Sequence, residues 1–256
     1  MQLFFGSLRV SLYCAFFNLR FMLCILSCTL LTVFLAFSSD LFQDSDVIYA
    51  LMHSEAAMSI ITICVLPILP YGLSFAEEWE ERAIRYSILR SGVKHYLCVK
   101  ILACALTGFL VLLLSRILSA LLLLMSRPFF SNIVYTDDPF STYLYTGHPI
   151  SYFLFAGIYR ALSGAFFSVL GLFISVFYKD ALNTISMPMV FYLFSLRFIP
   201  LFGTDFHLLW LSLADGIYPM RTPFLTLLLK LIWVCVWIVI LGITMTKHVK
   251  RMVLND

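Results

Sequence analysis

Six runs of mostly apolar residues alternate with short polar segments along the chain. The hydrocarbon core of a bilayer is crossed by about 20 helical residues, and each run comes near that length. The predicted spans are Phe21–Phe37, Ala57–Phe75, Leu97–Met125, Ile150–Tyr178, Ala181–Leu201 and Phe224–Met245. The pattern therefore predicts an all-α integral membrane protein with six transmembrane helices, forming a single domain over residues 1–256.

The segments outside these runs add two further elements. Residues 1–20 mix large apolar side chains with two arginines, which is typical of a helix lying along a membrane interface. Residues 246–256 form a short polar tail. The whole chain is 62% hydrophobic and 12% charged, whereas an average soluble domain is about 25% charged. A net charge of +3, without a patch of mixed basic and aromatic residues, gives no indication of nucleic-acid binding.

The distribution of basic residues predicts the orientation of the chain. If both termini are cytoplasmic, eleven lysines and arginines lie in cytoplasmic segments and two in outward loops. Basic residues favour the cytoplasmic side of a membrane. We therefore expect cytoplasmic termini and a location in the cell membrane, in a bacterium.

The densest group of charges follows the second predicted span. Residues 75–100 hold nine of the 31 charged residues, with acids first and bases later. Burying nine charges would cost more than about 20 kcal/mol on an insertion scale, so this segment reaches water. Acid–base pairs four residues apart and this charge order favour a helix over about 77–91. Ser91 and Gly92 are expected to end it, with Ser91 capping the next helix.

The same helix is expected to carry one apolar stripe. Its members recur at three- and four-residue spacing and are Trp79, Ala83, Tyr86, Leu89 and Val93. An exposed apolar stripe usually marks a contact with another molecule, and we favour docking to a protein. The alternative is a solvated loop whose charges only set the topology, although such a loop needs neither four acids nor a tryptophan.

Three arginines lie inside predicted spans and form a candidate substrate path: Arg116, Arg160 and Arg197. Charged residues within a membrane are functional candidates, here for an anionic or amphipathic substrate. We found no acid within the spans to pair with them. The alternative, which we favour, is that they snorkel to lipid phosphates or bond to free carbonyls. Lys230, near an outer end, is also expected to snorkel.

Small residues recur on one face of the fourth predicted span. They are Gly157, Ala161, Gly164, Ser168 and Gly171. Small side chains permit close helix packing in lipid. We interpret this stripe as a packing seam within the chain, with a dimer contact as the alternative.

This layout resembles the membrane subunits of type-2 ABC exporters, the ABC-2 permeases. Their loose motif between spans two and three is matched in order by Glu80-Glu81-Arg82, Ile88-Leu89, Gly92, Lys94-His95-Tyr96 and Lys100. Ala83-Ile84 stands where the family often has Gly-Thr, and Gly92 where it often has Pro. The resemblance implies an N-terminal elbow helix and a cytoplasmic coupling helix that docks on an ATPase subunit. The residues expected to dock are Glu78, Trp79, Glu81, Arg82, Arg85 and Leu89.

The resemblance also implies the partners. Two permease subunits, identical or different, pair with two cytoplasmic ATP-binding-cassette subunits that hold ATP and Mg²⁺. This chain has no G-x-x-x-x-G-K-[ST] motif and is expected to bind no cofactor and to catalyse no reaction itself. The transported substrate is not indicated.

Two other functions were weighed. Glu77–Arg82 matches EExxxR, a motif of CAAX-processing membrane proteases, but that zinc chemistry needs histidines on other spans. No histidine falls in a predicted span, so we interpret the match as coincidence. A membrane scaffold or accessory subunit without transport is the other alternative.

Overall fold

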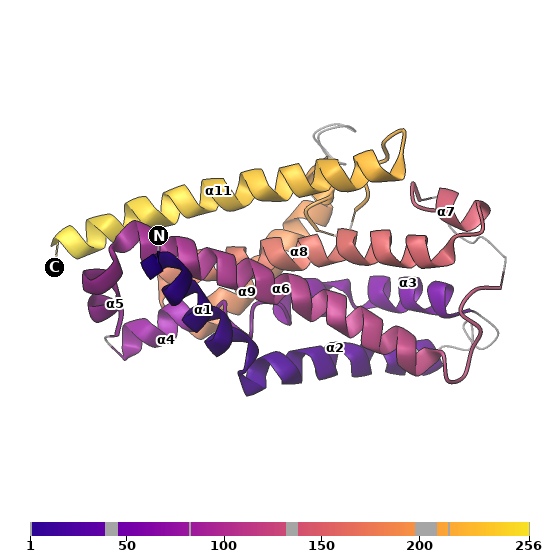
Figure 1. Ribbon diagram of the computed structural model, residues 1–256, viewed down its shortest axis with the longest axis horizontal. Coiled ribbons are helices and arrows are strands. Elements are labelled where there is room, and N and C mark those ends of the chain that lie inside the picture. The colour runs from indigo at the N-terminus through magenta and orange to yellow at the C-terminus, as the bar shows by residue number, and fades with distance from the viewer. Residues whose placement is uncertain are drawn as a thin grey trace.

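The computed structural model describes residues 2–38, 46–81, 83–131, 138–197, 209–214 and 216–255. The regular structure in these ranges is entirely helical, which confirms the all-α prediction. The helices form an elongated bundle (Figure 1). Their bounds are α1 Gln2–Phe16, α2 Leu19–Ser38, α3 Val47–Ala57, η2 Ile60–Val65, α4 Ser74–Glu80, α5 Ala83–Ser91, α6 Val93–Leu123, α7 Thr142–Tyr145, α8 Pro149–Tyr178, α9 Ala181–Arg197 and α11 Pro223–Asn255.

Four of these helices are long and apolar enough to cross a membrane: α2, α6, α8 and α11. They coincide with the first, third, fourth and sixth predicted spans. Exposed leucine, isoleucine and phenylalanine side chains cover α2 and α11, as expected where lipid is the solvent. The chain is therefore a multi-pass helical membrane protein.

Helix α8 is the centre of the bundle. In its most apolar window 83% of the residues are buried within the chain, against 22% in α11. The small-residue stripe explains how closely α6 and α8 approach. A Cβ added at Gly108 of α6 would lie 2.4 Å from the carbonyl oxygen of Gly164, and one at Gly164 would lie 2.6 Å from that of Gly108. Backbone contact at this distance is open only to glycine.

The other members of the stripe also face neighbours in the same chain. Ala161 and Ser168 are fully buried, and a Cβ at Gly171 would meet the side chain of Ile68 at 2.6 Å. At Gly157 the nearest atom would be Cδ of Arg116, at 3.1 Å. The stripe is thus an intrachain seam for α6 and for the segment before α4.

The region of the second predicted span differs from the prediction. A helix begins at Val47, ten residues before the expected start at Ala57, because Asp46 caps it by accepting the backbone N–H of Tyr49 at 2.8 Å. After the π-helix η2, residues 66–73 form turns around Pro67 and Pro70. Proline lacks the backbone donor that a continuous helix requires, and regular α-helix resumes only at Ser74.

Both chain ends described by the structure lie at one end of the bundle. The start of α1, the end of α11 and the charged helices α4 and α5 are grouped there, whereas α7 lies at the opposite end (Figure 1). Helix α1 packs against α6. The charged helices therefore lie at the same end of the bundle as both described chain ends (Figure 1).

Candidate functional site

The charged segment is two short helices, where the sequence predicted one. Helix α4 ends at Glu80 and α5 begins at Ala83, while Arg82 lies outside the described residues. The break between α4 and α5 separates Trp79 from the other members of the predicted apolar stripe. Tyr86 is 78% exposed, and among the side chains of α5 that the structure describes, Ile84 and Ile88 enter the core.

The boundary between α5 and α6 lies where it was expected. Gly92 has a φ of +78°, a backbone conformation that favours glycine, and it is the N-cap of α6. The N-cap position predicted for Ser91 is held by Gly92, and Ser91 is the last residue of α5. The positive φ turns the chain sharply and sends α6 back along the bundle.

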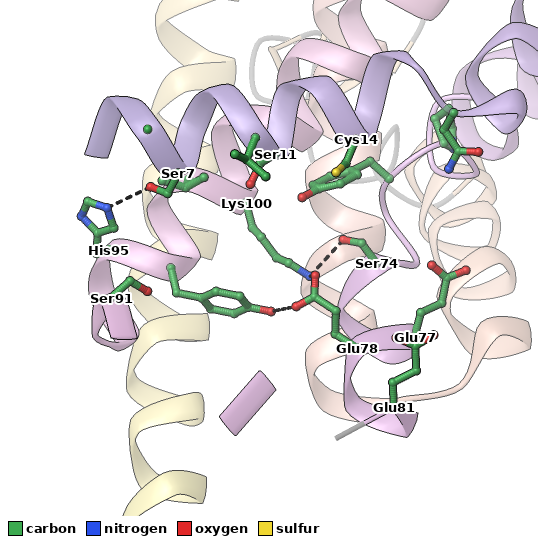
Figure 2. A pocket seen from close by; sticks show the side chains of 17 residues that line it. Ser7, Ser11, Cys14, Ser74, Glu77, Glu78, Glu81, Ser91, His95 and Lys100 are labelled. Atoms are coloured by element: carbon green, nitrogen blue, oxygen red, sulfur yellow. Dashed lines mark hydrogen bonds and ion pairs between the residues drawn. The ribbon is translucent and has the colours of Figure 1, made fainter. Parts of the chain in front are cut away.

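A buried ion pair fixes α4 to α6. The ammonium of Lys100 lies 2.9 Å from Oε1 of Glu78 and donates to Oγ of Ser74 at 3.2 Å. The hydroxyl of Tyr96 donates to Oε2 of the same carboxylate at 2.5 Å. Figure 2 shows Glu78 pointing at Lys100 and Ser74. The Lys100 side chain is 3% exposed and that of Glu78 31%, so the lysine is enclosed while water reaches the glutamate.

Aromatic rings complete the surroundings of the ammonium. Its nitrogen lies 5.2 to 5.9 Å from the ring centres of Tyr71, Phe75 and Tyr96. Ring faces attract cations within about 6 Å. Lys100 is therefore held from several directions, and α4 cannot shift along its axis without disturbing the first turns of α6.

Further contacts tie the charged segment to neighbouring helices. Arg20 at the start of α2 forms an ion pair with Glu77 of α4. Ser7 of α1 and His95 of α6 are hydrogen-bonded at 3.1 Å. Lys179, in the turn between α8 and α9, places its ammonium 3.4 Å from the ring centre of Trp79. The segment therefore contacts α1, α2, α6 and the end of α8.

Of the residues predicted to dock, some face the bundle and others face outward. Glu78 faces α6, and Trp79 is partly buried against the core. Glu81 is exposed, as is its neighbour Glu80. Arg82 lies outside the described residues, and the side chains of two further candidates on α5 are not described: Arg85 and Leu89. The outward surface described by the structure is thus Glu80, Glu81 and Tyr86.

A second buried ionic cluster lies in the half of the bundle nearer α7. Arg116 donates to Oε2 of Glu55 at 2.5 Å. Arg160 lies 3.6 Å from the same oxygen and donates to the Glu55 carbonyl and to Thr62 at 2.8 and 3.1 Å. Arg116 and Glu55 are each 5% exposed. The statement that no acid is available to these arginines is therefore wrong.

The three candidate path residues do not form one group. Arg116 and Arg160 converge on Glu55, whereas Arg197 is exposed at the end of α9. Lys230 is also not where it was expected. It is 1% exposed and donates to Oγ of Ser163 at 2.7 Å, with its ammonium 3.6 Å from the ring centre of Tyr159. It does not snorkel, because polar partners inside the bundle already satisfy it.

Two signals for these missed partners were present in the sequence. Glu55 lies outside the second predicted span, which begins at Ala57, but Val47, Ile48 and Leu51 already have helical spacing. Lys100 lies inside the third predicted span, which begins at Leu97, and a base within a span indicates a buried partner.

Among the residues that the structure describes, no group of three His, Cys, Asp or Glu side chains is placed to hold a metal ion. No family model, curated protein or solved structure matches the chain significantly.

Proposed function

We propose that this chain is the transmembrane subunit of an ATP-driven exporter of the ABC-2 type, and that α4 and α5 are its coupling element. The single observation that carries the proposal is the Glu78–Lys100 pair. It joins α4, whose end at Glu80 is exposed and acidic, to a helix long enough to span a membrane.

The proposed mechanism uses this connection as a lever. A cytoplasmic ATPase dimer holds the outward surface of Glu80, Glu81 and Tyr86 and closes when it binds ATP. Its closure moves α4, and the Glu78–Lys100 pair passes the movement to α6. Because α6 meets α8 in backbone contact at Gly108 and Gly164, the two helices shift together. This is a hinge-and-shear transition.

The contacts of Arg20 and Ser7 extend the lever to α2 and α1. In this proposal α1 is the interfacial elbow helix, the chain crosses the membrane six times, and both termini are cytoplasmic. The grouping of α4, α5 and both chain ends at one end of the bundle supports this topology (Figure 1). ATP and Mg²⁺ belong to the partner subunit, and a second permease subunit completes the path.

The buried arginines have a structural role in this proposal. The carboxylate of Glu55 neutralises a charge in the bundle interior, and the guanidinium groups hold α3 against α6 and α8. They are therefore not assigned to substrate contact.

The test is to co-express the chain with candidate ATP-binding-cassette subunits from the same genome and to measure copurification and ATPase stimulation. Glu81→Arg and Tyr86→Ala should each weaken ATPase binding about tenfold or more, as expected for central interface residues. Tyr145→Ala is the matched control, because Tyr145 is 66% exposed at the α7 end. Full coupling by Glu81→Arg, or full-rate transport with no ATPase bound, would contradict the proposal.

A further inference from the structure

A cavity of about 840 Å³ lies between α1, α4 and the first turns of α6. Ligand sites in proteins occupy about 300–1,000 Å³. Helix α1 forms one wall with Val10, Ser11 and Cys14, and the opposite side is formed by residues of α4 and α6 (Figure 2). The cavity thus lies between α1 and the lever, and it shares Glu81 with the outward surface.

The wall of the cavity combines apolar side chains, hydroxyl groups and two aromatic rings. Val10, Pro70 and Val99 supply apolar surface. The rings are those of Tyr71 and Tyr96, both at most 9% exposed. Such a wall suits a molecule with an apolar or aromatic body.

The described wall of the cavity has more negative than positive side chains. Among the described residues that line the cavity, three are glutamates, Glu77, Glu78 and Glu81, and one is a lysine, Lys100. That ammonium is already held by Glu78 and Ser74, so it is not free to receive an anion. Glu77 pairs with Arg20, and Glu81 adds a further negative charge at the edge of the cavity.

Two of the carboxylates are one helical turn apart. The backbone N–H of Glu81 bonds to the carbonyl of Glu77 at 3.0 Å, so both side chains leave the same face of α4. A cation beside this face gains from the carboxylate of Glu81, because Glu77 is paired with Arg20. The Lys100 ammonium already lies near both tyrosine rings of the wall. A phosphate or carboxylate ligand meets like charge at the same place.

We propose that this cavity is a binding site for an amphiphilic organic monocation, with the apolar body against α1 and the tyrosine rings and the charge toward Glu81. The site belongs to this chain alone, but it shares Glu81 with the proposed docking surface, so binding is tested in the absence of the ATPase.

The test uses two ions of the same shape and opposite charge. Tetraphenylphosphonium and tetraphenylborate are each equilibrated with the purified full chain in detergent, against protein-free micelles. We expect the phosphonium to bind at one site and the borate at least tenfold more weakly. Glu81→Gln should weaken phosphonium binding about three- to tenfold. Glu80→Gln is the matched control and should leave it unchanged, because the exposed carboxylate of Glu80 does not line the cavity.

A second measurement locates the ion without a substitution. Cys14, Cys98 and Cys235 are exposed thiols, and of these only Cys14 lines the cavity. The phosphonium should slow alkylation of Cys14 by N-ethylmaleimide and leave the other two rates unchanged. Equal binding of both ions, equal effects of the two glutamine substitutions, or no protection of Cys14 would each overturn the proposal. No ATPase is present, so these outcomes are independent of the test of the exporter function.

Discussion

The buried pair between Lys100 and Glu78 predicts unequal costs for the two single substitutions that break it. Glu78→Gln leaves an ammonium whose side chain is 3% exposed without a countercharge. Lys100→Met leaves a carboxylate whose side chain is 31% exposed and that still accepts from Tyr96. Water and the tyrosine solvate the remaining carboxylate, whereas the ammonium has only Ser74 and the aromatic rings.

The expected magnitudes follow from this difference. Removing one partner of a buried pair costs about 3–5 kcal/mol, and the rings around Lys100 place Glu78→Gln near 3 kcal/mol, the lower end of that range. For Lys100→Met the exposure of Glu78 reduces the cost to about 1–2 kcal/mol. The double variant leaves no buried charge unpaired and should cost less than the sum by about 2 kcal/mol.

The assay is equilibrium unfolding of the purified chain in mixed micelles by sodium dodecyl sulfate, followed by tryptophan fluorescence. The free energy of unfolding is compared for the wild type, both single variants and the double variant. A larger loss for Lys100→Met than for Glu78→Gln would refute the burial argument. Additive losses in the double variant would show that the two side chains do not interact.

Three further predictions concern other parts of the bundle, each measured by the same unfolding assay. Gly108→Ala should destabilise the chain by about 1–3 kcal/mol or more through overpacking, since its Cβ would meet backbone on α8; Gly6→Ala, with nothing within 4 Å, should not. Glu55→Gln should cost about 3–5 kcal/mol because it leaves Arg116 buried without its countercharge; an unchanged stability would contradict the pairing. Burial raises the pKa of Asp138 above its ordinary value of 3.8. The folded chain thus holds that proton more tightly than the unfolded chain. Protonated Asp138 therefore stabilises the folded chain at pH values below 3.8, and this contribution is lost as the pH rises through the higher pKa of Asp138 in the folded chain. As the pH rises through this range, the free energy of unfolding of the wild type should fall relative to that of Asp138→Asn.

The long helices could be predicted from the sequence because their signal is composition over many residues. The fourth predicted span, Ile150–Tyr178, differs from α8 by one residue. Its small residues recur where neighbours approach closely, with Gly164 against α6 and Gly171 against Ile68. Prediction was weaker for the region of the second span, where a capped helix, a π-helix and two prolines interrupt the apolar pattern.

The partners of the buried charges could not be predicted in the same way. Glu78 and Lys100 are 22 positions apart, and their contact depends on the reversal of direction at Gly92. Glu55 and Arg116 are 61 positions apart and meet only because α3 packs against α6. Such contacts require the three-dimensional arrangement of the helices, which periodicity along one segment does not contain.

The most direct test of the exporter account is the side of the membrane on which α4 and α5 lie. Tyr86 and Tyr145 are 78% and 66% exposed at opposite ends of the bundle. Each is replaced by cysteine in a variant without the seven native cysteines, and intact cells are treated with a membrane-impermeant maleimide. The account predicts labelling at position 145 in intact cells and at position 86 only after the membrane is opened. Labelling of position 86 in intact cells would place the charged helices outside the cell and contradict the account.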